Sequence, residues 1–222
     1  MRSDGWSSAV DIQAIFFRLT LDSATEFLFG KSCDSQISAT QKEAGQASDD
    51  TFLYGFDGCM GYLAERLRFE RLYWVIYNRE FRKCIEIVHA FVDQYVHSAL
   101  MQAEQQGEKA QGTEKVSPQY IFLEALTSTI KDPVRLRDES LNVLLAGRDT
   151  TASLLSWTVL LLARHPHIFA RLRSDILDQF GTYDQPHSMD FASLKSCQYL
   201  RHFLNETLRL YPVVPFNRRC AM

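Results

Sequence analysis

Hydrophobic residues recur along most of this chain at intervals of three and four, which is the spacing of one helix face. The pattern predicts one helix after another. It gives almost no sign of the strict alternation that is typical of strands, so the predicted fold class is mainly α. The predicted helices cover residues 10–29, 51–71, 78–105, 120–129, about 138–165, 166–180 and 194–210.

Glycine and proline mark several predicted helix ends. Gly30 and Gly181 are expected to stop the helices that they follow, because glycine accepts the backbone conformation found there. Asp132 and Pro133 offer a cap and a first-turn proline ahead of the central helix. Pro212 is expected to end the last helix.

The polar stretches indicate how the chain is divided. Residues 31–50 and 106–118 are predicted as flexible linkers, and residues 213–220 as an extended segment. With 222 residues, 46% of them hydrophobic, residues 1–222 are long enough to bury a core, and we expect a single domain.

Composition excludes several classes of function. The formal net charge of −3 gives no reason to expect a nucleic-acid partner. The five cysteines are scattered, with no C-x-x-C pair, which favours reduced thiols over a disulfide framework or a zinc site. No signal peptide is evident, and no apolar run approaches the roughly 20 residues that a membrane-spanning helix needs.

The central predicted helix contains an unusual polar turn, in which Gly147, Arg148, Asp149 and Thr150 interrupt an apolar run. Glycine lets a flat ligand approach the backbone closely. The hydroxyl of Thr150 can bond a carbonyl one turn back, which bends a helix, or a ligand. Asp149 next to Thr150 pairs a proton carrier with a proton donor. The alternative is a long core helix with a polar kink, in which Arg148 pairs with Asp149 or a neighbour; the residues alone leave both open.

The last predicted helix carries Glu206 and Arg209, which lie on one helix face at a spacing of i and i+3. Taken alone, this is most simply an exposed ion pair of little energetic weight. However, apolar residues surround it, and Pro212 and Pro215 restrict the segment that follows.

Both motifs resemble those of a known family. Residues 146–151 (AGRDTT) resemble the oxygen-binding-helix signature of the cytochrome P-450 haem-thiolate monooxygenases, and residues 206–212 (ETLRLYP) resemble their Glu-x-x-Arg helix. Residues 11–30 are similar to the fungal branch that hydroxylates alkanes and fatty acids. The resemblance covers nearly the whole chain and implies a partial cytochrome P-450 fold, with helices around a long central oxygen-binding helix and ending in the Glu-x-x-Arg helix.

The resemblance also implies roles for individual residues. Thr150 would donate a hydrogen bond to dioxygen at the haem, and Asp149 would help to deliver protons. Glu206 and Arg209 would be structural. The residues implied near the haem are Ala146, Gly147, Thr151 and Arg219, although Arg219 is alternatively an ordinary surface arginine. The residues implied in an apolar substrate pocket are Leu144, Leu145, Val213, Val214 and Phe216.

The implied reaction is the O₂- and NADPH-dependent hydroxylation of a long-chain alkane or fatty acid. Haem with a cysteine thiolate would be the cofactor, and electrons would come from NADPH–cytochrome P-450 reductase at the endoplasmic reticulum membrane. The family's haem-ligating cysteine loop does not occur in this chain, and Cys220 is expected to be an ordinary residue, so no metal ligand is assigned.

We therefore expect an internal piece of such an enzyme that is inactive as this truncated chain, because the thiolate favours O–O cleavage. The alternative is a non-catalytic helical remnant that binds a lipid or a protein partner. A helix bundle unrelated to haem proteins would require both ordered motifs to coincide by chance.

Overall fold

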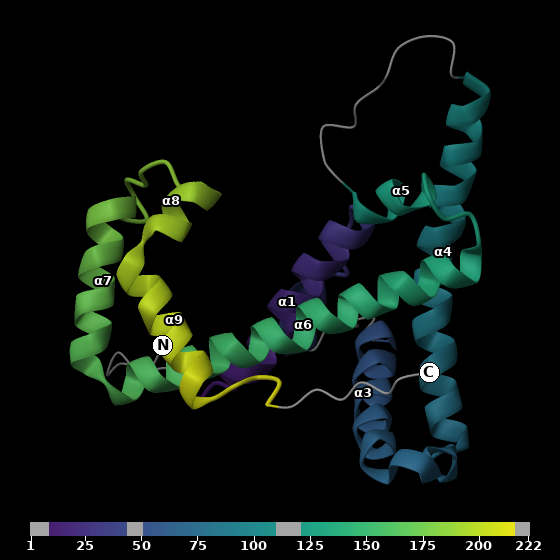
Figure 1. Cartoon of the computed structure of the whole chain (residues 1–222), viewed down its shortest axis with the longest axis horizontal. Helices are drawn as coiled ribbons and strands as arrows, with labels where there is room; N and C mark the ends of the chain where they lie inside the picture. Colours follow the sequence, from purple (N-terminus) through teal and green to yellow (C-terminus); the bar gives the residue numbers. More distant parts are fainter. Residues whose placement is uncertain (1–8, 44–50, 110–120, 216–222) are drawn as a thin grey trace. The chain divides into compact units, whose positions relative to one another are not determined.

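A computed structural model describes residues 9–43, 51–109 and 121–215. Figure 1 shows the helices in chain order. They are α1 (Ile12–Phe29), α2 (Ser35–Glu43), α3 (Thr51–Phe69), the 3-10 helix η1 (Glu70–Val75), α4 (Arg79–Lys109), α5 (Phe122–Thr127), α6 (Pro133–Arg164), α7 (Pro166–Phe180), α8 (Phe191–Ser196) and α9 (Gln198–Leu210). Within the described ranges, β structure is confined to one bridge between Gly181 and Pro186. The predicted mainly α class is confirmed.

The chain divides into two compact units, and both boundaries fall inside helices, α1 and α6. One unit is Arg18–Arg148, called the core unit below. The other combines Met1–Phe17 with Asp149–Met222 and is called the pocket unit. The expected single domain with two linkers stays a prediction.

The core unit is built around the apolar face of α4. Five apolar side chains spaced three or four residues apart on that helix are buried: Phe81, Cys84, Val88, Val92 and Val96. Side chains of this size each contribute about 1.5–3 kcal/mol when they are fully buried. The other fully buried large apolar side chains of the unit come from α1, α3 and the first half of α6: Leu21, Leu28, Phe56, Leu136 and Leu144.

Aromatic stacking ties α1 and α3 to α4 within the same unit. The rings of Phe29 and Tyr95 stack with centroids 4.6 Å apart. Those of Phe52 and Phe91 stack at 3.8 Å. Stacked aromatic pairs contribute about 0.5–1.5 kcal/mol beyond the area that they bury, so these rings help to hold α1 and α3 on α4.

The loop prediction for residues 31–50 is wrong in part, because Ser35–Glu43 forms α2. The carboxylate of Asp22 on α1 accepts hydrogen bonds from the backbone N–H groups of Ser35 at 2.8 Å and Gln36 at 3.1 Å. It thereby satisfies donors that a helix start leaves unpaired. Because the capping residue lies more than ten positions upstream, no local sequence pattern predicts the start of this helix.

Other boundaries also differ from the prediction. The central helix begins at Pro133 rather than near residue 138, and Asp132 caps it by accepting the backbone N–H of Val134 at 3.2 Å. The long helix α4 continues to Lys109, into the start of the predicted linker 106–118. Residues 110–120 lie outside the described part of the chain, as do residues 216–220 of the predicted extended segment.

The predicted helix 194–210 is two helices. Cys197 takes an extended conformation (φ −67°, ψ 91°) between α8 and α9. The first of the two starts earlier than expected because Asp190 and Ser193 form a reciprocal capping box. By contrast, α7 stops at Gly181 as predicted. The backbone there has a φ of +78°, and an added Cβ would lie 2.3 Å from the carbonyl oxygen of Gln185.

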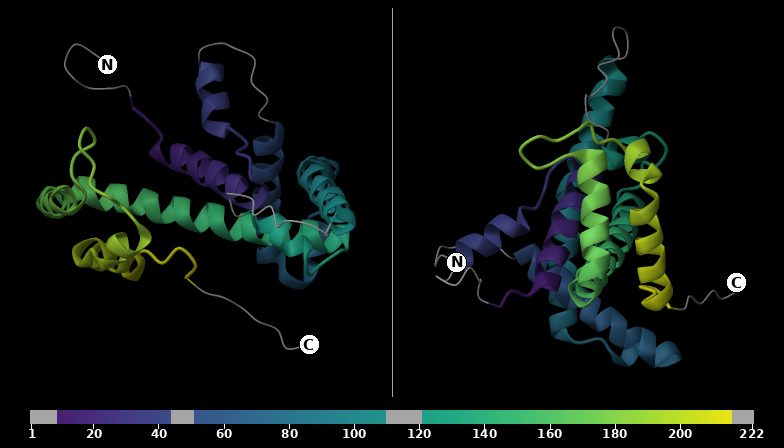
Figure 2. Two further views of the ribbon diagram at one scale, coloured as in Figure 1. Left: turned by 90° about the horizontal axis from the view of Figure 1, so that it is seen from above. Right: turned by 90° about the vertical axis from the view of Figure 1, so that its left-hand side faces the viewer.

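In the pocket unit, α7 and α9 lie side by side (Figure 2). Leu172 of α7 and Thr207 of α9 are buried. The guanidinium of Arg171 lies 4.3 Å from the centre of the Tyr199 ring. At the end of α9, the Tyr211 ring stacks on Trp157 of α6 with centroids 4.0 Å apart and planes 9° apart. This stack fixes the segment after α9 against the second half of α6.

Candidate functional site

The polar turn of α6 does not break the helix. The helix is continuous through residues 146–151, and its 32 residues span about 48 Å at 1.5 Å per residue. The residues of the polar turn therefore keep helical positions, and no kink opens the backbone there.

Arg148 points into the core unit, where its side chain is only 4% exposed. Its Nη2 pairs with the carboxylate oxygen Oδ1 of Asp57 on α3. Its guanidinium carbon lies 5.0 Å from the centre of the buried Phe56 ring. Arg148 is thus paired, as the alternative interpretation of the sequence expects. Its partner Asp57 lies on another helix and was not predicted from the sequence.

Ala146 and Gly147, which directly precede Arg148, are exposed on α6. A Cβ added at Gly147 would meet only the Cβ of Ala24, at 4.0 Å. The small side chains therefore leave space beside the backbone, as a flat ligand requires. Two residues predicted in a substrate pocket also lie in this unit: Leu144 is fully buried in its core, and Leu145 is exposed.

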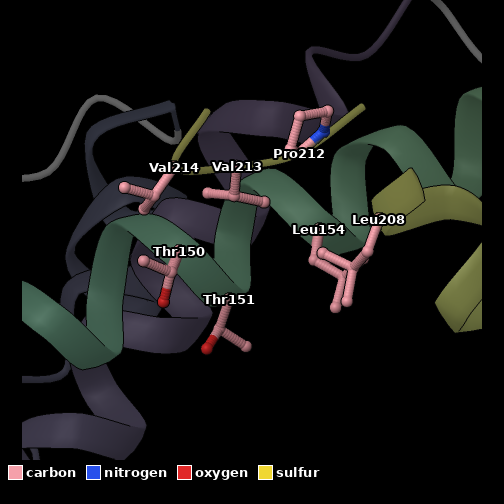
Figure 3. A pocket seen from close by; sticks show the side chains of 7 residues that line it. All are labelled: Thr150, Thr151, Leu154, Leu208, Pro212, Val213 and Val214. Atoms are coloured by element: carbon pink, nitrogen blue, oxygen red, sulfur yellow. The ribbon is translucent and has the colours of Figure 1, made fainter. Parts of the chain in front are cut away.

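The pocket unit contains a cavity of about 350 Å³ beside the second half of α6 (Figure 3). Five of its residues are apolar and two carry hydroxyl groups, which suits an apolar ligand held with few polar contacts. The residues that line it are Thr150, Thr151, Leu154, Leu208, Pro212, Val213 and Val214.

Four of the sequence-predicted residues meet in this cavity, although two come from α6 and two from the segment after α9. They are Thr150, Thr151, Val213 and Val214. In Figure 3, Leu154 and Leu208 are seen at one end of the cavity, away from the hydroxyl of Thr150. Phe216 and Arg219 fall outside the described residues.

Sequence reasoning missed Leu154, Leu208 and Pro212 as lining residues. The position of Leu154 was a usable signal, because it is four residues after Thr150 and so shares its helix face. Leu208 and Pro212 belong to the Glu-x-x-Arg helix and its end, which were interpreted as structural. Only the folded segment after α9 reveals that they face a cavity.

Glu206 and Arg209 form a bidentate ion pair within α9. Arg209 donates through Nε at 2.7 Å and through Nη2 at 2.6 Å to the two carboxylate oxygens. These hydrogen bonds lower the pKa of Glu206 and raise that of Arg209. Both side chains are exposed, so the pair by itself adds little to the stability of the unit.

The cysteines of the described ranges are free thiols: Cys33, Cys59, Cys84 and Cys197. Burial raises the pKa of Cys33 and of Cys59 to about 11. These two side chains therefore stay protonated at neutral pH and are poor thiolate ligands. No group of three His, Cys, Asp or Glu side chains within the described residues is placed to hold a metal ion. None of the helices described is long and apolar enough to cross a membrane.

The described residues form a helical protein whose longest helix contributes two threonines to a largely apolar pocket. A family model described as Cytochrome P450 matches residues 2–222. The chain belongs to the cytochrome P450 family, and the predicted family is confirmed.

Curated relatives match over almost the whole chain. Cytochrome P450 monooxygenase g430 of a Fusarium species is 46% identical over 99% of this chain and 39% of its own length. Cytochrome P450 52A8 of Candida tropicalis is 46% identical over 95% of this chain and 41% of its own. Cytochrome P450 52A10 of Candida maltosa is 45% identical over 95% and 40%. The chain thus spans about two fifths of the length of these relatives.

A solved structure supports the fold. The crystal structure of the cytochrome P450DA heme domain matches with a TM-score of 0.66 and 17% sequence identity. The match covers 93% of this chain and 41% of that chain. The predicted partial cytochrome P-450 fold is therefore confirmed.

Proposed function

We propose that this chain forms the helical, substrate-holding part of a cytochrome P450 monooxygenase that hydroxylates a long-chain alkane or fatty acid. The observation that carries the proposal is the cavity of the pocket unit, which Thr150 and Thr151 line together with Val213 and Val214. An alkyl chain fits such an apolar lining, and the two hydroxyls are the polar groups of the lining.

The residues of the core unit fit the haem that the family uses. Ala146 and Gly147 are small and exposed, with open space beside Gly147. We propose that one face of the haem lies against them. When bound, the haem supplies the redox chemistry that activates dioxygen.

The chain's own residues have proposed roles around that chemistry. The Thr150 hydroxyl donates a hydrogen bond toward dioxygen, and the carboxylate of Asp149 passes protons to the site from solvent. The leucine and valine side chains of the cavity exclude water and hold the alkyl chain. Thr151 is proposed near the haem, and Glu206 with Arg209 as a structural pair.

The partners and location of the whole protein are also proposals. Electrons would come from NADPH through a cytochrome P450 reductase, and the complete enzyme would work at the endoplasmic reticulum membrane. The Fusarium relative is named a monooxygenase, which supports this class of reaction.

The cavity is tested with dodecanoic acid as the probe. We expect Leu154→Trp to fill the cavity and weaken binding at least about tenfold, because a bulky side chain competes for the space of the alkyl chain. Leu160→Trp is the matched control, since Leu160 lies on the same helix, is exposed and does not line the cavity. Equal binding of dodecanoic acid by both variants would show that the cavity is not the site where the alkyl chain binds.

Activity is a separate measurement. The chain is supplied with haem, reductase, NADPH and O₂, and hydroxylated dodecanoate is measured by mass spectrometry. Product supports the monooxygenase. Probe binding without product from the 222-residue chain agrees with its expected inactivity, and absence of product from the complete enzyme as well would support the alternative of a non-catalytic lipid-binding remnant. The same measurement tests the expectation that the 222-residue chain is inactive alone.

A further inference from the structure

The aromatic rings of Trp157 on α6 and Tyr211 at the end of α9 stack beside the cavity but are not among its lining residues. Their centroids are 4.0 Å apart and their planes differ by 9°, so the two rings lie almost flat on one another. Trp157 is half-buried, and Tyr211 is 36% exposed. Both belong to the pocket unit, and neither has a role in the function proposed above.

Each stacked ring follows lining residues of the cavity at helical spacing. Trp157 comes three residues after Leu154 and seven after Thr150, and residues at these spacings lie on one side of a helix. Tyr211 comes three residues after Leu208. The stack is therefore a contact between α6 and the end of α9 that lies in line with the cavity.

The stack also anchors the segment that contributes to the cavity after α9. The chain leaves helical geometry at Tyr211 (φ −131°, ψ 74°), and residues 212–215 form no regular secondary structure. Pro212 and Pro215 have no backbone N–H to donate. A segment of this kind takes its position from the residue before it, and the ring of that residue is held on Trp157.

Four of the side chains that line the cavity have little freedom to adjust its width (Figure 3). Thr150 and Thr151 come from α6, and Val213 and Val214 come from the segment after α9. All four are β-branched, and such side chains are restricted in their first torsion angle. The width of the cavity therefore depends on where the backbone of residues 213–214 lies relative to α6.

We propose that Trp157 and Tyr211 act together as positioning residues that fix the width of the cavity and restrict it to an unbranched alkyl chain. They act through Val213 and Val214, whose backbone the stack holds in place. A methyl branch widens the chain, and one methyl or methylene group changes binding in a hydrophobic pocket by about 10- to 200-fold. The proposal rests on the proposed function for the identity of the ligand as an alkyl chain.

Binding of two fatty acids with equal numbers of carbon atoms tests this role in the 222-residue chain. Dodecanoic acid is unbranched, and 10-methylundecanoic acid carries a methyl branch near its end. We expect the unbranched acid to bind about tenfold more tightly. Trp157→Ala and Tyr211→Ala should each reduce this preference to about twofold or less, because a segment that is no longer held can move away from α6. Trp157→Phe keeps a ring that can stack and should retain the preference.

The double variant shows whether the two rings act as one unit. If they do, Trp157→Ala with Tyr211→Ala should change the preference no more than either single substitution, because each ring acts only through the other. Tyr199→Ala is the matched control, since Tyr199 lies on α9, contacts Arg171 and does not line the cavity. The control should keep the preference. Additive effects, unchanged preferences in the single variants, or an equal loss in the control would overturn the proposal.

The ratio of the two affinities separates positioning from a purely structural role. A loss of stability alone would reduce the folded fraction and weaken binding of both acids by the same factor, leaving their ratio unchanged; that result would also overturn the proposal. The measurement needs neither haem nor reductase. If the unaltered chain bound neither acid, the proposed function of the cavity would fail together with this role. If it preferred the unbranched acid and the variants did too, only the role of the stack would fail.

Discussion

The guanidinium of Arg148 on α6 pairs with the carboxylate of Asp57 on α3, and the two residues are 91 positions apart in the chain. Arg148 is buried, and Asp57 reaches solvent. The carboxylate of Asp57 therefore neutralises the buried guanidinium of Arg148, the residue that follows the exposed Gly147 in the sequence. Burying a charge without such a partner is costly.

The first prediction concerns this pair. Asp57→Ala should lower the free energy of unfolding by about 1–3 kcal/mol, because it removes a carboxylate that pairs with the buried guanidinium of Arg148. Urea denaturation followed by circular dichroism measures the change. Asp138→Ala is the matched control: its carboxylate lies 3.4 Å from Arg137 and is exposed. The control should cost well under about 1 kcal/mol; equal losses in both variants would show that burial of Arg148 is unimportant.

The second prediction concerns Asp22, which caps α2 from α1. Asp22→Ala removes the acceptor for the backbone N–H groups of Ser35 and Gln36 and for the Cys33 thiol at 3.2 Å. Losing a helix cap costs about 0.5–2 kcal/mol. Hydrogen exchange should speed up in Ser35–Glu43 and remain slow around Val92. Protection of α2 that is unchanged in the variant would contradict the assigned cap.

The third prediction is a pH dependence. Burial, followed by the hydrogen bond to Asp22, raises the pKa of Cys33 from 9.0 to about 11. The folded chain holds this proton more tightly than the unfolded chain, so its stabilising contribution is complete below pH 9 and is lost as the pH rises through about 11. Urea denaturation across that range should show falling stability. Cys33→Ser keeps a hydrogen-bond donor that does not ionise there, and should fall less steeply. An equal slope in both proteins would rule out this thiol as the source.

The parts of the fold that follow from local periodicity were predictable. The buried face of α4 repeats every three or four residues, and Gly181 stops α7 at a positive φ. The predictions are wrong or incomplete where residues far apart in the sequence determine the local structure. α2 depends on Asp22, and the partner of Arg148 lies on another helix far upstream. Neither relationship leaves a periodic trace in the sequence.

Part of the candidate site was likewise predictable from the sequence, and part of it was not. Thr150 and Val213 were placed in one site through the resemblance of two motifs, and both line the cavity. Leu208 was missed because its motif was interpreted as structural. Leu208 lies one turn before Pro212, and both line the cavity next to the place where the Tyr211 ring stacks on Trp157.

The fourth prediction separates the two threonines of the cavity. Thr150→Val keeps shape and removes the hydroxyl. If Thr150 takes part in proton delivery, the variant should bind dodecanoic acid normally, yet form product about a hundredfold more slowly in the complete, haem-loaded enzyme with reductase. Thr151→Val is the matched control, because Thr151 lines the same cavity and is more exposed.

Two measurements decide between a proton-delivery role and a packing role for Thr150. The ratio of product formed to NADPH consumed reports proton delivery, whereas the dissociation constant of dodecanoic acid reports packing. A fall in that ratio only for Thr150→Val supports the proposed role. Weaker binding with an unchanged ratio would show that Thr150 only packs against the bound ligand. Equal effects of both variants would show that Thr150 and Thr151 do not differ in role.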